Sequence, residues 1–261
     1  MGYALGESAA KPTGDSRKVQ RLPLSMYTRD EIFLLGTVLG DGNLHRRHQW
    51  DRVCSIKLAH APRELEWLTW KAERVAKILG SKAKITPAMS NGVLKAYQWC
   101  AGFSNYVHLY DEFYRDNKKT FTSGLLSQLG LQELAVFWCD DGGVVKSLRQ
   151  KKNPRTGKLY PNLLQETQGN LAVYENETQT KVIADWIESL TGAPSAVSFH
   201  KKTGLYYLRF NRRSLDLLCS AIQDFVPACM KHKIDLTPIP VGERAQVQQQ
   251  RAIRRQECAA T

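Results

Sequence analysis

The chain has 261 residues, of which 43% are hydrophobic and 24% are charged, a balance that excludes disordered, collagen-like and disulfide-scaffold proteins. Its 37 lysines and arginines against 25 acidic residues give a formal net charge of +12, which favours a polyanionic partner, and nucleic acid over a membrane because the basic residues are spread through strand-like segments. No apolar run approaches the ~18 residues of a membrane span, and residues 1–24 contain no hydrophobic signal core, so we expect a soluble protein that is not secreted.

Six cysteines are scattered singly, with no CxxC pair and no histidine at a zinc-binding spacing. We expect small buried side chains in an intracellular reducing compartment, either a bacterial cytoplasm or an organelle. The residues are Cys54, Cys100, Cys139, Cys219, Cys229 and Cys258.

The first half of the chain begins with an apolar helical run, Glu31–Gly42, that ends in Asp-Gly. Strand-like stretches follow, and then a helix from Pro62 to Leu79 whose apolar residues share one face and which ends at Gly80. Two more strand-like stretches, a further helix and the basic run Asn117–Thr120 complete this half.

The second half repeats this order. The apolar run Glu133–Gly142 also ends in Asp-Gly, and Asp141 follows Asp41 by 100 positions, the length of a domain. A helix ending at Gly192 and the basic cluster Lys231–Lys233 match their counterparts. We therefore predict an α+β fold of two pseudo-symmetric αββαββα repeats, each with a four-stranded antiparallel sheet. The predicted boundaries are 1–24 for an N-terminal tail, 25–127 and 128–240 for the two repeats, and 241–261 for a C-terminal tail.

The second repeat contains about a dozen extra residues in its first hairpin. Asp41 lies 39 positions before Gly80, whereas Asp141 lies 51 positions before Gly192. The surplus falls in a stretch with turn signals at Asn153-Pro154 and Thr156-Gly157, which predicts a long hairpin with a basic tip. Its basic residues are Lys146, Arg149, Lys151, Lys152, Arg155 and Lys158.

The two apolar runs resemble a known pair of motifs. The segments 34–42 (LLGTVLGDG) and 134–142 (LAVFWCDDG) are similar to those of the single-chain LAGLIDADG homing endonucleases, and the similarity covers about residues 25–240. It implies that the antiparallel sheets form a saddle over the major groove of double-stranded DNA, and that a long target is cut with a stagger. It also implies that Asp41 and Asp141 bind a divalent metal ion.

The same resemblance places a lysine near each scissile phosphate. Lys119 matches this position in the first repeat, and Lys233 matches it in the second, with Lys231 as the alternative. The motifs depart from the family pattern at Val136, which replaces a glycine, so the two halves should not be chemically equivalent. We include Gly40 and Asp140 with Asp41 and Asp141 in the predicted metal site, although Asp140 points about 100° away around the helix, which favours a structural role.

The motif residues also suggest this chemistry on physical grounds. Gly36 and Gly40 lie on one helix face and would let a partner helix approach closely, with the small residues Ala135 and Cys139 opposite. The two aspartates would then meet at the negative ends of both helix dipoles, where a divalent cation relieves their repulsion. Oxygen ligands fit Mg²⁺, with Ca²⁺ or Mn²⁺ as substitutes. The alternative is that each Asp-Gly simply ends a buried helix and that the lysines are solvated charges.

Side chains of a strand alternate between its two faces, so we expect one set of apolar residues on each strand to face the core. These sets are Cys54, Ile56 and Leu58; Ala83 and Ile85; and Tyr206, Leu208 and Phe210. The opposite faces carry basic and amide side chains and almost no acids, as base and phosphate contacts require; an ordinary solvated sheet would carry more Glu and Asp. The predicted DNA-binding residues are Arg46, Arg47, His48, Ser55, Lys57, Lys82, Lys84, Lys95, Gln98, Lys146, Arg149, Lys151, Lys152, Arg155, Gln168, Asn170, Ser198, His200, Lys201, Lys202, Arg209 and Asn211.

These observations predict a monomeric, site-specific, Mg²⁺-dependent endonuclease of double-stranded DNA, with no membrane partner. The alternative is a nucleic-acid-binding protein of the same fold, either an RNA intron maturase or an endonuclease that has lost cleavage. The presence of both motif aspartates argues against the degenerate form but not against a bifunctional one.

Overall fold

The computed structural model describes residues 27–46, 48, 51–115, 118–244, 246 and 249. The predicted N-terminal tail therefore lies outside the described residues, as does the end of the predicted C-terminal tail. None of the helices in the described part of the chain combines the length and the apolar character needed to cross a bilayer.

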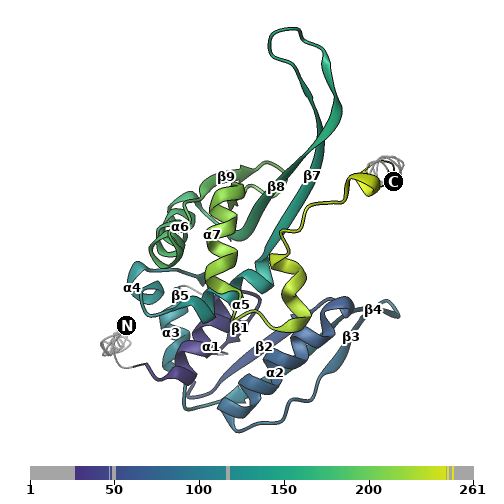
Figure 1. Cartoon of the computed structure of the whole chain (residues 1–261). Coiled ribbons are helices and arrows are strands. Elements are labelled where there is room, and N and C mark those ends of the chain that lie inside the picture. The colour runs from purple at the N-terminus through teal and green to yellow at the C-terminus, as the bar shows by residue number, and fades with distance from the viewer. Residues whose placement is uncertain are drawn as a thin grey trace, which may run out of the picture.

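The first half of the chain forms a four-stranded antiparallel sheet in the order β1-β2-β4-β3 (Figure 1). A short two-stranded hairpin, β5–β6, was not expected and carries Lys119. The elements are α1 (Arg29–Leu39), β1 (Asn43–His45), β2 (Cys54–His60), the 3₁₀ turn η2 (Pro62–Glu64), α2 (Leu65–Leu79), β3 (Thr86–Ser90), β4 (Val93–Phe103), α3 (His108–Phe113), β5 (Tyr114–Arg115), β6 (Lys118–Lys119) and α4 (Ser123–Leu126).

The second half forms a sheet of the corresponding order, β7-β8-β10-β9. Helices and strands alternate as in the first half, so the predicted fold class is confirmed. The proposed boundary between residues 127 and 128 falls between α4 and α5 and stays a prediction. The elements are α5 (Leu131–Asp141), β7 (Gly142–Lys152), β8 (Leu159–Glu175), α6 (Glu177–Thr191), β9 (Ala196–His200), β10 (Leu205–Phe210), α7 (Arg212–Ile222), η3 (Ala228–Ile234) and η4 (Val241–Glu243).

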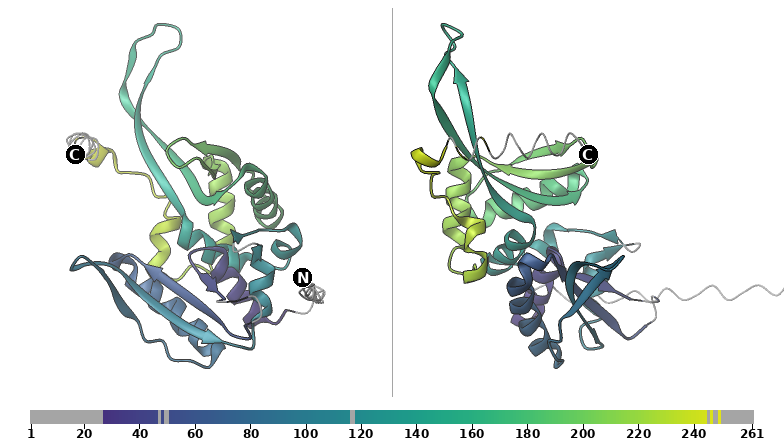
Figure 2. Two further views of the ribbon diagram at one scale, coloured as in Figure 1. Left: turned by 180° about the vertical axis from the view of Figure 1, so that it is seen from behind. Right: turned by 90° about the vertical axis from the view of Figure 1, so that its right-hand side faces the viewer.

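Helices cover one face of each sheet. Helix α2 packs on β2 and β4, whereas α6 and α7 pack on the second sheet, which leaves the other sheet faces uncovered (Figure 2). Both α2 and α6 end at a glycine in the left-handed conformation, Gly80 with φ 62° and Gly192 with φ 67°, as the sequence predicted. Helix α1, the first motif helix, begins with a reciprocal capping box formed by Thr28 and Glu31.

The two motif helices, α1 and α5, pack against each other between the two sheets. Every residue from Phe33 to Leu39 is buried, and so is every residue from Glu133 to Cys139. These helices are therefore buried on all sides, although helices on a protein surface bury only one stripe. A single apolar core joins them to both halves.

The closest contacts between the motif helices involve the two glycines of α1. A Cβ atom added at Gly36 would lie 2.5 Å from Cγ of Glu133, and one added at Gly40 would lie 2.3 Å from Oδ2 of Asp140. The backbones can meet only because both positions lack a side chain. The prediction that Ala135 and Cys139 lie opposite these glycines was wrong, because the nearest atoms belong to Glu133 and Asp140 of α5.

The predicted alternation holds for β2 and for the end of β10, whereas Tyr206 of β10, expected in the core, is half-buried at a register irregularity between Tyr206 and Tyr207. Cys54, Ile56 and Leu58 of β2 are buried, and Leu208 and Phe210 of β10 are buried beside exposed Arg209. The stretch around Ala83 was placed wrongly: β3 begins at Thr86, and Ala83 is exposed. Local alternation over residues 82–85 was too short to distinguish a strand from an extended connection.

The predicted long hairpin is present. Strands β7 and β8 pair from Gly142 opposite Leu171 out to Lys152 opposite Leu159, with an irregularity between Gln150 and Lys152. Eleven residues at ~3.3 Å each make β7 roughly 35 Å long. The hairpin therefore projects well beyond the rest of the molecule (Figures 1 and 2).

Candidate active site

The two motif aspartates lie at the C-terminal ends of α1 and α5, but their backbones differ. Asp141 is the last residue of α5, whereas α1 ends at Leu39 and leaves Asp41 in the turn that follows Gly40. The Asp141 carboxylate is half-buried and makes no hydrogen bond or ion pair within the described residues. Burial raises its pKa to about 8, and the neighbouring carboxylates of Asp41 and Asp140 add to this rise.

Asp41 is the more exposed of the pair, with 39% of its side chain accessible. Its Oδ2 atom lies 3.4 Å from Nδ1 of His60. Burial and then the Asp140 carboxylate raise the pKa of Asp41, while Lys71 and Lys119 oppose that rise. Two carboxylates that both resist ionisation therefore share one region at the end of the motif helices.

One lysine donates to the carbonyl groups at the end of each motif helix. Nζ of Lys119 donates to the carbonyl oxygens of Val38 at 2.9 Å and Gly40 at 2.8 Å. Nζ of Lys233 donates to those of Gly142 at 2.9 Å and Asp140 at 3.4 Å. An ammonium group has three donors, so each lysine retains one N–H for another acceptor. Burial lowers the pKa of Lys119, and the nearby Asp141 and Asp41 carboxylates oppose that change.

The structure distinguishes between the two lysines considered for the second repeat. The indole Nε1 of Trp138 donates to the backbone oxygen of Lys233 at 2.9 Å, which ties η3 to the motif helix α5. Lys231 is exposed and donates to the backbone oxygen of Gln223 instead. Lys233 is therefore the lysine at the end of α5.

The predicted metal-binding roles of Gly40 and Asp140 stay predictions, and the structure shows what else these two residues contact. The Gly40 carbonyl already accepts from Lys119. The Asp140 side chain is completely inaccessible, and its Oδ1 accepts from Nζ of Lys71 at 2.6 Å and from Nε1 of Trp67 at 2.7 Å. Each of the two residues therefore already has a structural contact, and a carboxylate held by a buried ammonium group is a weaker ligand for a further cation.

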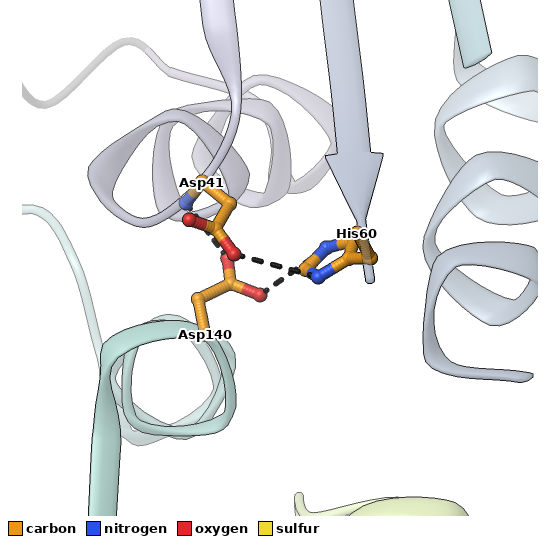
Figure 3. A group of neighbouring side chains, drawn as sticks. All are labelled: Asp41, His60 and Asp140. Atoms are coloured by element: carbon orange, nitrogen blue, oxygen red, sulfur yellow. Dashed lines mark hydrogen bonds and ion pairs between the residues drawn. The ribbon is translucent and has the colours of Figure 1, made fainter. Parts of the chain in front are cut away.

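His60 and Lys71 were missed by the sequence reading. Ligand atoms of Asp41, His60 and Asp140 all lie within 4.8 Å of one another (Figure 3). His60 is 2% accessible, and burial lowers the pKa of its imidazole, so this group favours the neutral form. The burial of both residues could have been predicted from the sequence. His60 follows Cys54, Ile56 and Leu58 on the buried face of β2, and Lys71 lies on the apolar face of α2.

The arrangement fits a divalent cation held by Asp41 and Asp141. Both are oxygen donors, which Mg²⁺ and Ca²⁺ prefer. The unpaired, half-buried Asp141 carboxylate favours this location, because a nearby cation would offset the cost of its ionisation. His60 and Asp140 would then contact Asp41, the metal-binding residue, and hold it in position.

Several predicted DNA-binding residues lie near Asp141 or on exposed surfaces. Asp141, Asn170 and His200 line a shared hollow of about 350 Å³, in which two tyrosines, Tyr206 and Tyr207, form part of the wall. Oδ1 of Asn170 is buried without a hydrogen-bond partner in the described structure. Further predicted residues that are exposed or half-buried are His48, Ser55, Lys57, Lys95, Gln98, Lys151, Lys152, Arg155, Gln168, Ser198, Lys201, Lys202 and Arg209.

Other predicted DNA contacts have protein partners. Arg46 forms a largely buried ion pair with Asp111 at 2.8 Å and lies over the Tyr110 ring, so its predicted DNA contact stays a prediction. Asn211 caps α7 by accepting from the Ser214 amide.

Of the other predicted DNA-binding residues, two form ion pairs within the protein and two lie outside the sheet. Lys146 pairs with Asp235 at 2.7 Å, and Arg149 pairs with Glu166 at 3.1 Å. Lys82 and Lys84 are exposed but precede β3 and do not lie on the sheet. Arg47 lies outside the described residues.

Comparison with known proteins gives the family. Residues 32–218 match the family model described as the LAGLIDADG DNA endonuclease family. This match spans more than half of the chain, so the chain belongs to that family, and the predicted resemblance and enzyme class are confirmed.

The fold is shared with a solved structure of a homing endonuclease. The homing endonuclease I-WcaI bound to its DNA recognition sequence is 14% identical, with a TM-score of 0.59 over 87% of this chain and 96% of that chain. I-DmoI in complex with DNA and Ca is 13% identical, with a TM-score of 0.45 over 76% and 92% of the two chains.

Among curated proteins, Protein RecA of Mycolicibacterium chitae is 25% identical over 129 residues. This match covers 48% of the present chain and 29% of that protein. The chain therefore spans less than a third of this relative.

The raised pKa of Asp141 predicts a pH-dependent loss of stability. A carboxyl group with a folded pKa of about 8 and an ordinary pKa of 3.8 binds its proton more tightly in the folded state. The free energy of unfolding should therefore fall as pH rises from about 4 to 8. Without metal, Asp141→Asn should avoid this loss and raise the unfolding midpoint at pH 8 by roughly 2–4 °C, or about 1 kcal/mol after allowance for partial exposure.

Thermal unfolding in EDTA from pH 5 to 8.5 measures this difference. Asp224→Asn, at an exposed position on the second repeat, is the control and should show no difference that grows with pH. A constant offset between Asp141→Asn and wild type at every pH would contradict the proposed cost of ionising Asp141.

Proposed function

We propose that the chain is a site-specific, divalent-metal-dependent endonuclease that hydrolyses one phosphodiester bond in each strand of double-stranded DNA. The observation that carries this proposal is the pair of carboxylates, exposed Asp41 and half-buried Asp141, each at the end of a motif helix and each accompanied by a lysine. Family membership is the basis for the long target and the staggered cuts. We further propose that the protein acts as a monomer, since one chain supplies both halves of the site.

The metal ion is proposed to be Mg²⁺, bound by Asp41 and Asp141, with Ca²⁺ or Mn²⁺ as substitutes. When bound, such an ion makes a water molecule more acidic and stabilises negative charge on a phosphate. The two carboxylates would hold the ion beside the surface on which DNA is proposed to bind. Burial is the main reason that both resist ionisation, and a neighbouring carboxylate adds to it, Asp140 for Asp41 and Asp41 for Asp141.

The lysines are suited to binding the scissile phosphates. In hydrolysis a P–O bond forms to the oxygen of water, a P–O bond of the DNA backbone breaks, and the departing oxygen takes up a proton. Lys119 and Lys233 are each held by two carbonyl groups, which fixes the third N–H in space for a phosphate oxygen. A fixed cation at this point stabilises the charge that develops on that oxygen.

The uncovered faces of the two sheets are the proposed DNA-binding surface. They carry basic, amide and hydroxyl side chains, and the hollow beside Asp141 brings Asn170 and His200 next to the proposed reaction centre. The net charge of +12 supports a strongly salt-dependent interaction with DNA. A reducing compartment remains our proposal for the cell, in keeping with the free thiols of buried Cys54, Cys139 and Cys219.

Replacing either aspartate should separate cleavage from binding. Asp41→Asn and Asp141→Asn keep the side-chain shape but remove a charge that holds the metal. Cleavage should fall by roughly a hundredfold or more, equivalent to about 3 kcal/mol. Affinity for DNA should persist or rise, because an aspartate repels phosphate whenever the metal is absent.

The measurement combines a mobility-shift titration in Ca²⁺ or EDTA with a cleavage time course in Mg²⁺, on a target first selected from randomised duplexes. Asp185→Asn on the exposed side of α6 is the control and should cut as wild type does. If wild type binds DNA or RNA but never cuts, the chain is a binding protein of this fold. If the two active-site variants cut at the wild-type rate, Asp41 and Asp141 have no role in cleavage and serve only to terminate the motif helices.

The β7–β8 hairpin should add non-specific affinity for DNA. Lys151, Lys152 and Arg155 are exposed near its tip, and each phosphate contact releases a counterion. Replacing all three by Ser should weaken binding to every duplex and reduce the slope of log K against log salt by roughly one unit per lost contact. A matched triple, Lys77→Ser, Lys181→Ser and Arg213→Ser, removes the same charge from helices α2, α6 and α7. An equal reduction in both triples would show that only net charge matters.

A further inference from the structure

Asp140 of the second repeat reaches across the motif-helix interface to the backbone of Asp41. Its Oδ2 atom accepts a hydrogen bond from the Asp41 amide at 3.0 Å, and this bond joins residues 99 positions apart. The amide is available because α1 ends at Leu39, two residues before Asp41. The second motif has no such break, since α5 remains helical through Asp141.

Lys71 of the first repeat is the counter-charge that stabilises the buried Asp140 carboxylate. Both Asp140 and Lys71 have side chains with no accessible surface, and Nζ of Lys71 lies 2.6 Å from Oδ1 of Asp140. Lys71 belongs to α2, which packs on the first sheet. A buried charge without a partner would cost several kcal/mol, so Lys71 and Asp140 must be present together. The indole of Trp67 donates to the same oxygen.

The fit of this carboxylate also explains Gly40. A Cβ at position 40 would lie 2.3 Å from Oδ2 and 2.8 Å from Cβ of Asp140, so any side chain there would displace the group that holds Asp41. The two motifs occupy corresponding positions, with Gly40 in one and Asp140 in the other. The contact therefore acts in one direction only, because Gly40 has no side chain that could hold Asp141.

We propose that Asp140, neutralised by Lys71, is a positioning residue that holds Asp41 in place, so that the two half-sites of the enzyme depend on different supports. His60 gives a second support through the 3.4 Å contact between its Nδ1 and Oδ2 of Asp41. The proposal rests on the proposed function for its effect on DNA cleavage. Loss of Asp140 should disturb the centre built on Asp41 and leave the centre built on Asp141 much less affected.

Two double variants isolate the hydrogen bond from the ion pair. Asp140→Ala with Lys71→Met removes the acceptor and the counter-charge together, so no buried charge is left alone. Asp140→Asn with Lys71→Met removes the same charges but keeps an oxygen that can accept from the Asp41 amide. The control is Glu177→Ala with Lys181→Met, which removes an ion pair of the same 2.6 Å length from the exposed surface of α6.

The first readout does not depend on DNA. Hydrogen exchange of the Asp41 amide, followed by nuclear magnetic resonance, should be slow in wild type, the control and the Asn-containing variant, and at least roughly tenfold faster in the Ala-containing variant. Equal exchange rates in all four proteins would overturn the proposal. Thermal unfolding of each protein shows whether a change is local or reflects general loss of the fold.

The second readout is cleavage of a duplex labelled on both strands in Mg²⁺. The Ala-containing variant should cut one strand roughly tenfold more slowly than wild type, while the other strand changes much less, so that nicked product accumulates. The Asn-containing variant should restore part of the lost rate. Equal slowing of both strands, or no slowing, would contradict the positioning role. If wild type cuts no DNA, the proposed function fails, and the amide exchange rates still decide whether Asp140 holds Asp41.

Discussion

The close approach of the motif helices at Gly36 and Gly40 is the constraint on which the site depends. The approach leaves no room for a Cβ at these two positions, and the helices are buried from Phe33 to Leu39 and from Glu133 to Cys139. It also brings the carboxylates of Asp41 and Asp141 into one region, where burial and neighbouring carboxylates raise their pKa values. The protein thus accepts an unfavourable charge arrangement, which a divalent cation can relieve.

The two repeats share a topology but not the chemistry at their helix ends. A lysine holds the terminal carbonyl groups in both, which is the symmetric part of the site. Asp140, paired with Lys71, and His60 contact Asp41, whereas Asp141 lines the hollow beside β8, β9 and β10. The same duplication therefore yields one supported and one unsupported carboxylate, together with one short and one long first hairpin.

The sequence was sufficient for the fold because each element had a local signal. Apolar periodicity and terminal glycines located α2 and α6, and the 100-residue spacing of Asp41 and Asp141 revealed the duplication. The pairing of polar groups across the interface could not be obtained in this way. The partner of Arg46, Asp111, lies 65 positions away along the chain, and the partner of Asp140, Lys71, belongs to the other repeat. Such partners depend on tertiary distances, which composition and spacing do not encode.

The location of the cation is the point on which this view of the site can be checked by a single experiment. Crystals of the full chain grown with Mn²⁺ can be measured at the manganese absorption edge, where the anomalous signal identifies the ion. We expect the peak between the carboxylates of Asp41 and Asp141, with Asp140 still bound to Lys71. A peak held by Asp41, His60 and Asp140, or one distant from both motif aspartates, would contradict the proposed division between metal ligands and their supports.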